Sequence, residues 1–169
     1  MTHAHESNVV GALCLAVADR LGEASAAGGG GSAAGALVAL HGAGAGGTID
    51  ALARVVGLTH SGAVRLVDRL ARGGLVERRA GADQRSAALY LTPAGRRAAR
   101  RVLARREAAI EAVLAPLGRA DREHLARIAG RLLGDLGSEP GAERRLCRLC
   151  DTEGCGRARG RCPVTTPAT

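Results

Sequence analysis

Residues 48–96 read TIDALARVVGLTHSGAVRLVDRLARGGLVERRAGADQRSAALYLTPAGR, and this stretch decides the fold. Apolar side chains recur at helical spacing from Thr48 to Val56 and again from Thr59 to Ala71, with Gly57 between the two segments. The hairpin that follows consists of two predicted strands, residues 75–80 and 86–91. A helix, a glycine-containing turn, a second helix and a hairpin predict a winged helix-turn-helix, in a mainly α fold with a small β-wing.

Threonines mark the starts of the helices in and after this stretch. Thr48 is a candidate N-cap of the first helix, and Thr92 followed by Pro93 is a strong start signal for a long helix. The apolar residues that we expect to face the core are Ile49, Leu52, Ala53 and Val56 in the first helix, and Val64, Val67 and Leu70 in the second.

Further helices flank the winged segment on both sides. We expect them at residues 8–25, 33–41, 93–114 and 121–136, after a disordered N-terminus at residues 1–7. The first and last carry wide apolar stripes, which we interpret as a dimer interface, with packing inside one chain as the alternative. The stripe residues are Val10, Leu13, Cys14, Val17 and Leu21, and Leu125, Ile128, Ala129, Leu132, Leu133 and Leu136. Cys14 is expected to be a buried small hydrophobe.

Composition excludes several classes of function. Aromatic residues make up 1% of the chain, so it lacks the stacking platforms of single-strand binders. No apolar run reaches the length of a membrane span, and the N-terminus lacks the order of a secretory signal. We therefore expect a cytoplasmic, nucleoid-associated protein without a membrane partner.

The net charge of +8 is concentrated in the winged segment. Residues 48–100 hold ten Arg and four acidic residues, so they carry most of the excess. All basic side chains of the protein are Arg. A concentrated basic region indicates a polyanion, here double-stranded DNA, as the partner.

The second helix of the pair, residues 59–71, is the candidate recognition helix. Residues near its start are expected to point outward, where they can reach base edges in the major groove: Thr59, His60, Ser61, Gly62 and Arg65. Arg65 can make a bidentate contact with guanine. Arg69 is expected to contact phosphate or to form an ion pair with a surface acid, and Arg78 or Arg79 on the first strand is expected to face the DNA backbone.

These residues resemble the MarR family of bacterial transcription regulators. The resemblance lies in the order L-A-x-x-x-G-L, V-D-x-L, G-L-V-x-R, D-x-R and L-T-x-x-G, and it covers about residues 8–136. It implies a DNA-binding lobe at about 33–96 and dimerisation helices at about 8–25 and 94–136. It also implies a homodimeric repressor of a pseudo-palindromic operator, relieved by a small ligand or by oxidation, whose wing Arg85 enters the minor groove while Asp83 holds it.

The tail, residues 137–169, departs from that family scheme. Four cysteines follow the spacing C-x2-C-x4-C-x6-C: Cys147, Cys150, Cys155 and Cys162. A closed four-thiolate zinc site and an iron–sulfur cluster are both consistent with this run, and a disulfide switch or no role is the third possibility. A metal or redox sensor that controls DNA binding is therefore the alternative function. A thiol–disulfide enzyme is disfavoured because no βαβ pattern surrounds the C-x2-C pair, and we expect no catalytic residues.

Overall fold

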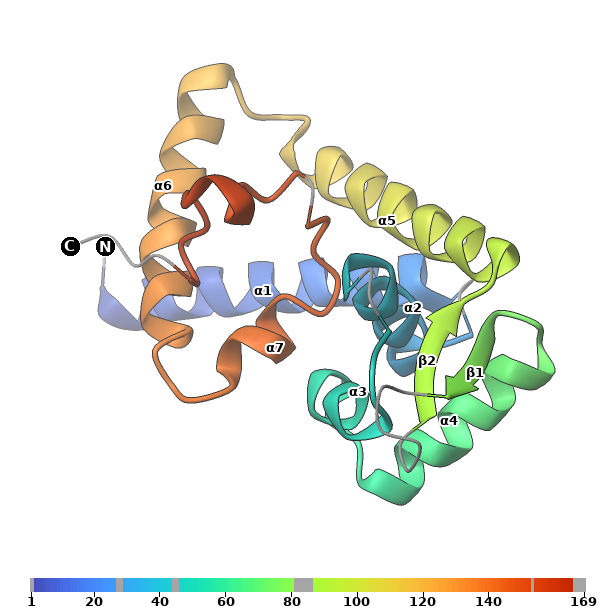
Figure 1. The fold of residues 1–169 in the computed structure, drawn as a ribbon. Coiled ribbons are helices and arrows are strands. Elements are labelled where there is room, and N and C mark those ends of the chain that lie inside the picture. The colour runs from blue at the N-terminus through green and yellow to red at the C-terminus, as the bar shows by residue number, and fades with distance from the viewer. Residues whose placement is uncertain (1, 27–28, 44–45, 81–86, 153, 166–169) are drawn as a thin grey trace.

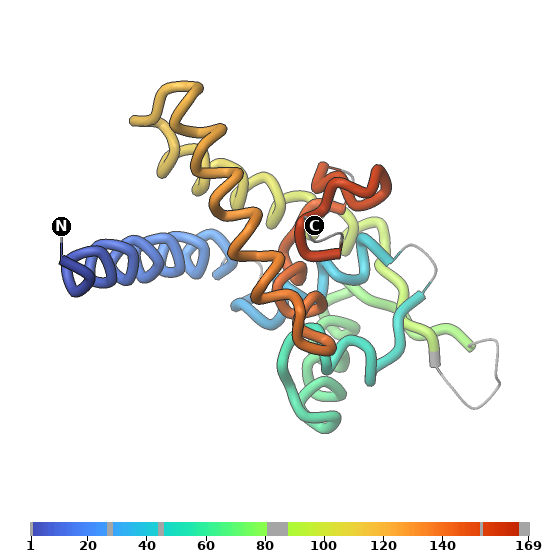
Figure 2. Tube along the Cα trace, turned by 90° about the vertical axis from the view of Figure 1, so that its left-hand side faces the viewer, coloured from blue at the N-terminus to red at the C-terminus, as the bar shows by residue number. Residues whose placement is uncertain are grey.

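The computed structural model describes residues 2–26, 29–43, 46–80, 87–152 and 154–165. A winged helix-turn-helix lobe lies beside long helices that extend away from it (Figures 1 and 2). The helices are α1 (His3–Ala26), α2 (Gly31–Ala43), α3 (Ile49–Val56), α4 (His60–Arg72), α5 (Pro93–Leu114), α6 (Arg119–Leu136) and α7 (Ala142–Leu146). The strands are β1 (Val76–Ala80) and β2 (Ala87–Leu91), and a 3-10 turn, η1, covers Arg157–Arg159. The predicted mainly helical fold with a β-wing is confirmed.

The wing is an antiparallel hairpin whose register runs from Val76 opposite Leu91 to Ala80 opposite Ala87. Gly47, just before α3, adds a third short segment to it through a β-bridge with Leu89. The Gly47 amide donates to the Leu89 carbonyl at 3.0 Å, and the Leu89 amide donates back at 2.7 Å. The hairpin is therefore fixed to the start of the helix-turn-helix.

One apolar core unites the lobe with the start of α5. Its largest fully buried side chains are Leu37, Val67 and Leu89, from α2, α4 and β2. The remaining members are Ala33, Ala36, Leu40, Leu52, Leu66, Leu70, Val76, Leu91, Ala98 and Ala99. Because α2 and α5 both contribute side chains to this core, the winged helix-turn-helix lobe is packed directly against the long helix α5.

The long helices form the second part of the molecule. Both α1 and α2 pack against α5. No residue of α6 is buried, and the N-terminal half of α1 extends away from the lobe (Figure 2). No helix in the described ranges combines the length and the apolarity that crossing a bilayer requires.

The structure departs from the sequence-based expectations in three places. The first helix begins at His3, well before residue 8, because the amides of His5 and Glu6 bond to the Thr2 carbonyl and Glu6 lies in the favourable first turn. Cys14 is exposed, so its expected burial is wrong for the single chain, since this part of α1 has no covering element. The tail contains α7 and η1, neither of which was expected.

Candidate nucleic-acid interface

The start of α4 is fixed by a side-chain cap. The Thr59 hydroxyl oxygen accepts a hydrogen bond from the Gly62 amide at 3.2 Å and lies 3.3 Å from the Ser61 hydroxyl. A Cβ at Gly62 would lie 3.2 Å from the same hydroxyl oxygen, so glycine leaves room for the cap. Thr59, His60 and Ser61 are exposed, as expected, and Gly62 is half-buried.

His60 ties the two helices of the motif together. Its Nδ1 lies 2.7 Å from an Asp50 carboxylate oxygen in the first turn of α3, and both side chains are largely exposed. The sequence suggested a base or phosphate contact for His60, but did not suggest this partner. The pair links α3 and α4, and the exposed His60 ring stays a predicted DNA contact.

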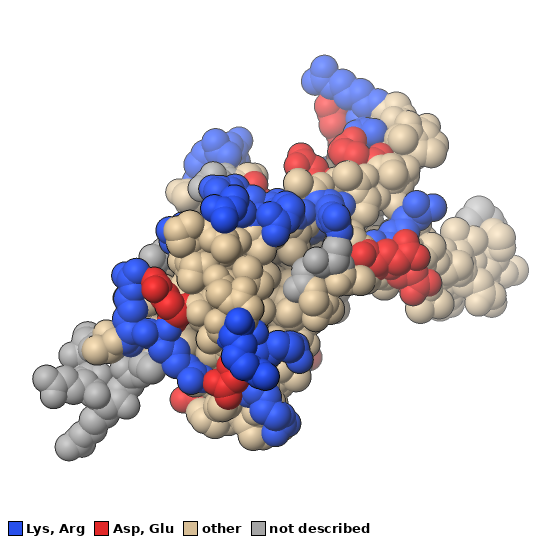
Figure 3. Space-filling view, turned by 90° about the vertical axis from the view of Figure 1, so that its right-hand side faces the viewer, with Lys and Arg blue, Asp and Glu red and all other residues tan. Residues whose placement is uncertain are grey.

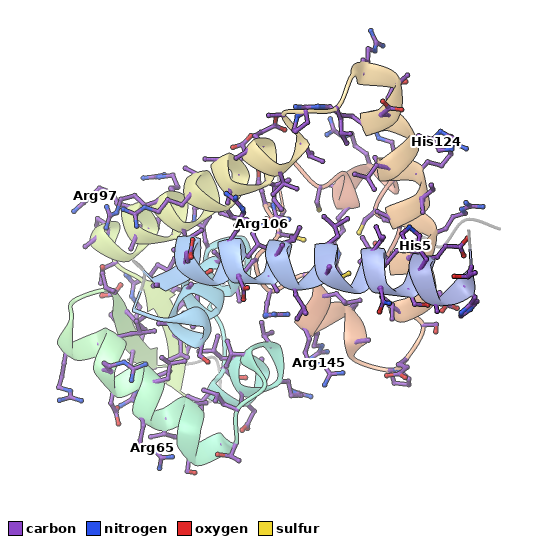
Figure 4. All side chains as sticks on the ribbon, turned by 180° about the vertical axis from the view of Figure 1, so that it is seen from behind. His5, Arg65, Arg97, Arg106, His124 and Arg145 are labelled. Carbon is purple, nitrogen blue, oxygen red and sulfur yellow. The ribbon has the colours of Figure 1, made fainter. Side chains whose placement is uncertain are left out.

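The outer face of α4 carries exposed arginines. Arg65 projects from α4 away from the body of the protein (Figure 4), and Arg69 and Arg72 are also exposed. The Arg72 Nε donates to the Asp68 carbonyl at 3.4 Å. The guanidinium group of Arg65 is therefore exposed to solvent near the capped end of the helix. In helix-turn-helix proteins, side chains at this position contact base edges in the major groove.

The buried face of α4 consists of residues that differ in part from those predicted. Val67 and Leu70 are buried as expected, but Val64 is only half-buried. Ala63 and Leu66 take the central places instead, because positions 63, 66, 67 and 70 form the continuous helical stripe.

Two arginines of β1 lie on opposite faces of the hairpin. Arg78 forms an ion pair with Asp68 of α4 at 2.7 Å, and both side chains remain partly exposed. Arg79 forms an ion pair with Glu77, and its guanidinium carbon lies 4.7 Å from the centre of the Tyr90 ring. Arg78 thus links the wing to α4, while Arg79 is held along the strand.

Asp83 and Arg85, the predicted minor-groove pair, lie outside the described residues. On the face shown in Figure 3, arginines gather in two groups, with a few carboxylates between them. Arg96, Arg97, Arg100 and Arg101 at the start of α5 are all exposed. The basic surface therefore reaches beyond the helix-turn-helix onto the first turns of α5.

A contact that the sequence did not single out holds the base of the wing. The Thr92 hydroxyl donates to the Gly74 carbonyl at 2.6 Å and accepts from the Gly95 amide at 3.0 Å. Gly95 lies so close to β1 that a Cβ there would come within 1.9 Å of the Leu75 carbonyl oxygen. The L-T-x-x-G pattern thus has a structural explanation, because it locks α5 onto the turn that leads into the wing.

The predicted metal ligands all lie in the folded part of the tail. Cys147 ends α7, Cys162 is buried, and Cys150 and Cys155 are half-buried. Within the described ranges, no three His, Cys, Asp or Glu side chains are arranged as the ligands of a metal ion. The zinc and iron–sulfur assignments stay predictions.

Residues 30–86 match the sequence model described as the MarR family. Over this segment, which holds the helix-turn-helix, the chain is similar to the MarR family. The matched range runs from the start of α2 through the wing tip, so it contains the whole helix-turn-helix. The cysteine tail lies outside the matched range. No curated protein sequence matches the chain.

Solved structures share the fold over most of the chain. YusO from Bacillus subtilis has a TM-score of 0.66 at 23% identity, covering 76% of this chain and 92% of its own. MepR, a transcription regulator of the Staphylococcus aureus multidrug efflux pump MepA, has a TM-score of 0.65 at 16% identity, covering 80% and 99%. Mycobacterium tuberculosis MarR-family protein Rv2887, in complex with p-aminosalicylic acid, has a TM-score of 0.55 at 24% identity, covering 78% and 98%. The MarR fold therefore includes the helices outside the winged lobe.

Proposed function

We propose that this protein is a homodimeric transcription regulator of the MarR family that reads duplex DNA with α4 and the wing. The observation that carries the proposal is the exposed, capped start of α4 with Arg65 pointing away from the core. Exposed Arg69, Arg78 and Arg79 on the same lobe supply phosphate contacts. MepR, which shares the fold, is named as a transcription regulator. Such a protein acts in the cytoplasm, on the nucleoid.

Two uncovered apolar faces support the homodimer. On α1 these are Val9, Val10, Leu13 and Leu15, which are 48–70% exposed. On α6 they are Leu125, Ile128, Leu132 and Leu136, which are 37–60% exposed. Exposed side chains of this size on two helices are typical of an interface between subunits. A two-fold dimer would place two copies of α4 in successive major grooves, about 34 Å apart.

We further propose repression that is relieved by a small acidic ligand. A cavity of about 570 Å³ lies between α1, α2, α3 and the tail, a volume suited to a small molecule. Its wall is apolar at Leu21, Val56 and Leu149, while Arg145 and Arg148 come from the tail. Two guanidinium groups beside an apolar wall fit a carboxylate on a hydrophobic body. The Rv2887 complex contains p-aminosalicylic acid, which is a molecule of this class.

Selection from a random duplex library tests the proposed function. The protein is incubated with the library, bound duplexes are amplified, and the enriched sequences are read. We expect an inverted repeat with half-sites about one helical turn apart. A library that stays random after repeated rounds at low salt would contradict sequence-specific DNA reading.

The wing gives a second expected outcome for the same function. Arg85→Ala removes the arginine that the MarR pattern assigns to the minor groove, so affinity for the selected duplex should fall several-fold. The slope of log affinity against log salt concentration should also become shallower by about one unit, because the variant lacks one positive charge that would lie near the DNA phosphates. Fluorescence anisotropy over a series of salt concentrations measures both values. If the affinity and the slope are unchanged, Arg85 does not contact the DNA.

A further inference from the structure

The first half of α5 is strongly basic. Residues 93–106 contain six arginines and no acidic residue, and the first acidic side chain of the helix is that of Glu107. Four of these arginines are exposed and lie three or four positions apart, so they share the side of α5 that faces away from its buried residues. We call these four residues the α5 arginine patch: Arg97, Arg100, Arg101 and Arg105.

The charges of the α5 arginine patch are not balanced within the described residues. The ion pairs of this part of the chain lie elsewhere, and none of them includes a member of the patch. Arg97 and Arg105 each lie four positions from Arg101, so their like charges repel one another. The first turn of α5 also lacks an acidic residue, although the helix dipole favours one there. The patch is therefore unfavourable in the free protein, which is typical of residues that serve binding.

The α5 arginine patch begins at the base of the wing. Arg96, the residue just before it, donates from its guanidinium group to the Leu91 carbonyl at 2.8 Å, where β2 ends. Arg97 projects away from the body of the protein at the end of α5 that lies nearest the wing (Figure 4). A polyanion that lies on α4 and the wing therefore has a second basic surface beside it.

We propose that the α5 arginine patch binds the phosphate backbone of the duplex that flanks the site read by α4 and the wing. The inference rests on the proposed function, because it takes the same DNA molecule as the partner. Guanidinium groups form strong, charge-assisted hydrogen bonds with phosphate oxygens. Such contacts add affinity whatever the base sequence of the flank, and they make binding more sensitive to salt.

The flanking duplex must curve toward α5 to reach the patch. From its start beside the wing, α5 leads away from the helix-turn-helix lobe (Figure 1). Curving a duplex costs elastic free energy, which contacts with the phosphates of the curved part offset. The cost is lowest where the flank contains flexible pyrimidine–purine steps. We therefore expect the binding site to extend beyond the base pairs that α4 and the wing contact.

Two duplexes of different length test this inference with the full chain. One holds only the selected inverted repeat, and the other adds about two helical turns of fixed, arbitrary sequence on each side. We expect the unaltered chain to bind the longer duplex several-fold more tightly at low salt. The slope of log affinity against log salt concentration should be steeper for the longer duplex by about one unit for each added phosphate contact. Fluorescence anisotropy measures both values.

A double substitution in the patch should remove most of this gain. Arg97→Ala with Arg101→Ala takes away two patch arginines that lie four positions apart. Arg127→Ala with Arg131→Ala is the matched control, because it removes two exposed arginines at the same spacing from α6. The control should keep the gain in affinity from the flanks. Hydroxyl-radical footprinting should show protection of the flanks by the unaltered chain and by the control, but not by the patch variant.

Thermal unfolding separates this role from a structural one. Because the patch arginines repel one another and alanine is a good helix former, the patch variant should unfold at the same temperature as the unaltered chain or at a higher one. A clearly lower unfolding temperature would assign these arginines to the stability of the fold and contradict the inference.

The outcomes distinguish the inference from the proposed function. If the patch variant gains as much affinity from the flanks as the control does, the patch does not bind flanking DNA, and the inference is wrong while the reading of DNA by α4 stands. Equal binding of the two duplexes by the unaltered chain leads to the same conclusion. A chain that enriches no inverted repeat from the random library would contradict both.

Discussion

Gly95 shows how one absent side chain sets the geometry of the wing. A Cβ there would come within 1.9 Å of the Leu75 carbonyl oxygen and 3.1 Å of a Leu91 methyl group. The Leu75 carbonyl also accepts the amide of Thr92, whose hydroxyl caps α5. A shift of the backbone at Gly95 would disturb both the cap of α5 and the hairpin, so a larger residue cannot be accommodated there without strain.

Gly95→Ala should therefore destabilise the protein by about 1–3 kcal/mol, the usual range for overpacking. Chemical denaturation followed by circular dichroism measures this change. Gly11→Ala on α1 is the matched control, because nothing lies within 4 Å of the added methyl group. The control should keep or slightly raise the stability, as alanine is the better helix former. Equal stability of the two variants would show that α5 is not locked against the wing.

The elements of the winged lobe were largely predictable because their signals are local. Thr48 and Thr92 cap helices as predicted, Thr59 caps α4 although it was not predicted as a cap, and Gly57 ends α3 with φ +68°. The stripe of α4 was partly wrong at Val64, because burial depends on neighbouring elements and not on side-chain size alone. The ion pairs of Arg78 with Asp68 and of His60 with Asp50 join elements, so no local pattern predicts them.

The buried stripe of α4 gives a prediction for this element. Leu66→Ala removes a side chain that is 2% exposed, which should lower the free energy of unfolding by about 2–5 kcal/mol and loosen the packing of α4 on the core. Thermal and chemical unfolding measure the loss. Arg105→Ala on α5, where the side chain is exposed, is the comparison and should leave the stability nearly unchanged. A protomer equally tolerant of both changes would mean that Leu66 does not anchor α4.

At the scale of the whole molecule, the apolar faces and the tail were only partly predictable. Helical spacing located exposed apolar residues of α6 such as Leu132 and Leu136, but on α1 the predicted Val17 and Leu21 are half-buried, while Val9 and Leu15 outside the predicted stripe are exposed. The folded tail could not be derived, because its turns depend on glycines with positive φ, such as Gly141 and Gly156, and on contacts with distant helices. The prediction of a metal site rests on cysteine spacing alone.

A double substitution on α6 tests the assembly. Ile128→Glu with Leu132→Glu places two charges in the exposed apolar face, so the protein should sediment as a monomer while the unaltered chain sediments as a dimer. Arg127→Glu is the charge-changing control, because helical spacing places it on the opposite side of α6. Should the double variant remain a dimer, the interface would have to lie elsewhere.

The most direct test of the central claim is the affinity of Arg65→Ala for the selected duplex, measured by fluorescence anisotropy at fixed salt. The account predicts a loss of about 5- to 150-fold, equivalent to one bidentate base contact, together with relaxed preference at a single base pair of each half-site. Arg119→Ala, which removes a 93% exposed arginine at the start of α6, should bind as the unaltered protein does. Equal affinity and an unchanged base preference for Arg65→Ala would contradict the reading of DNA by α4.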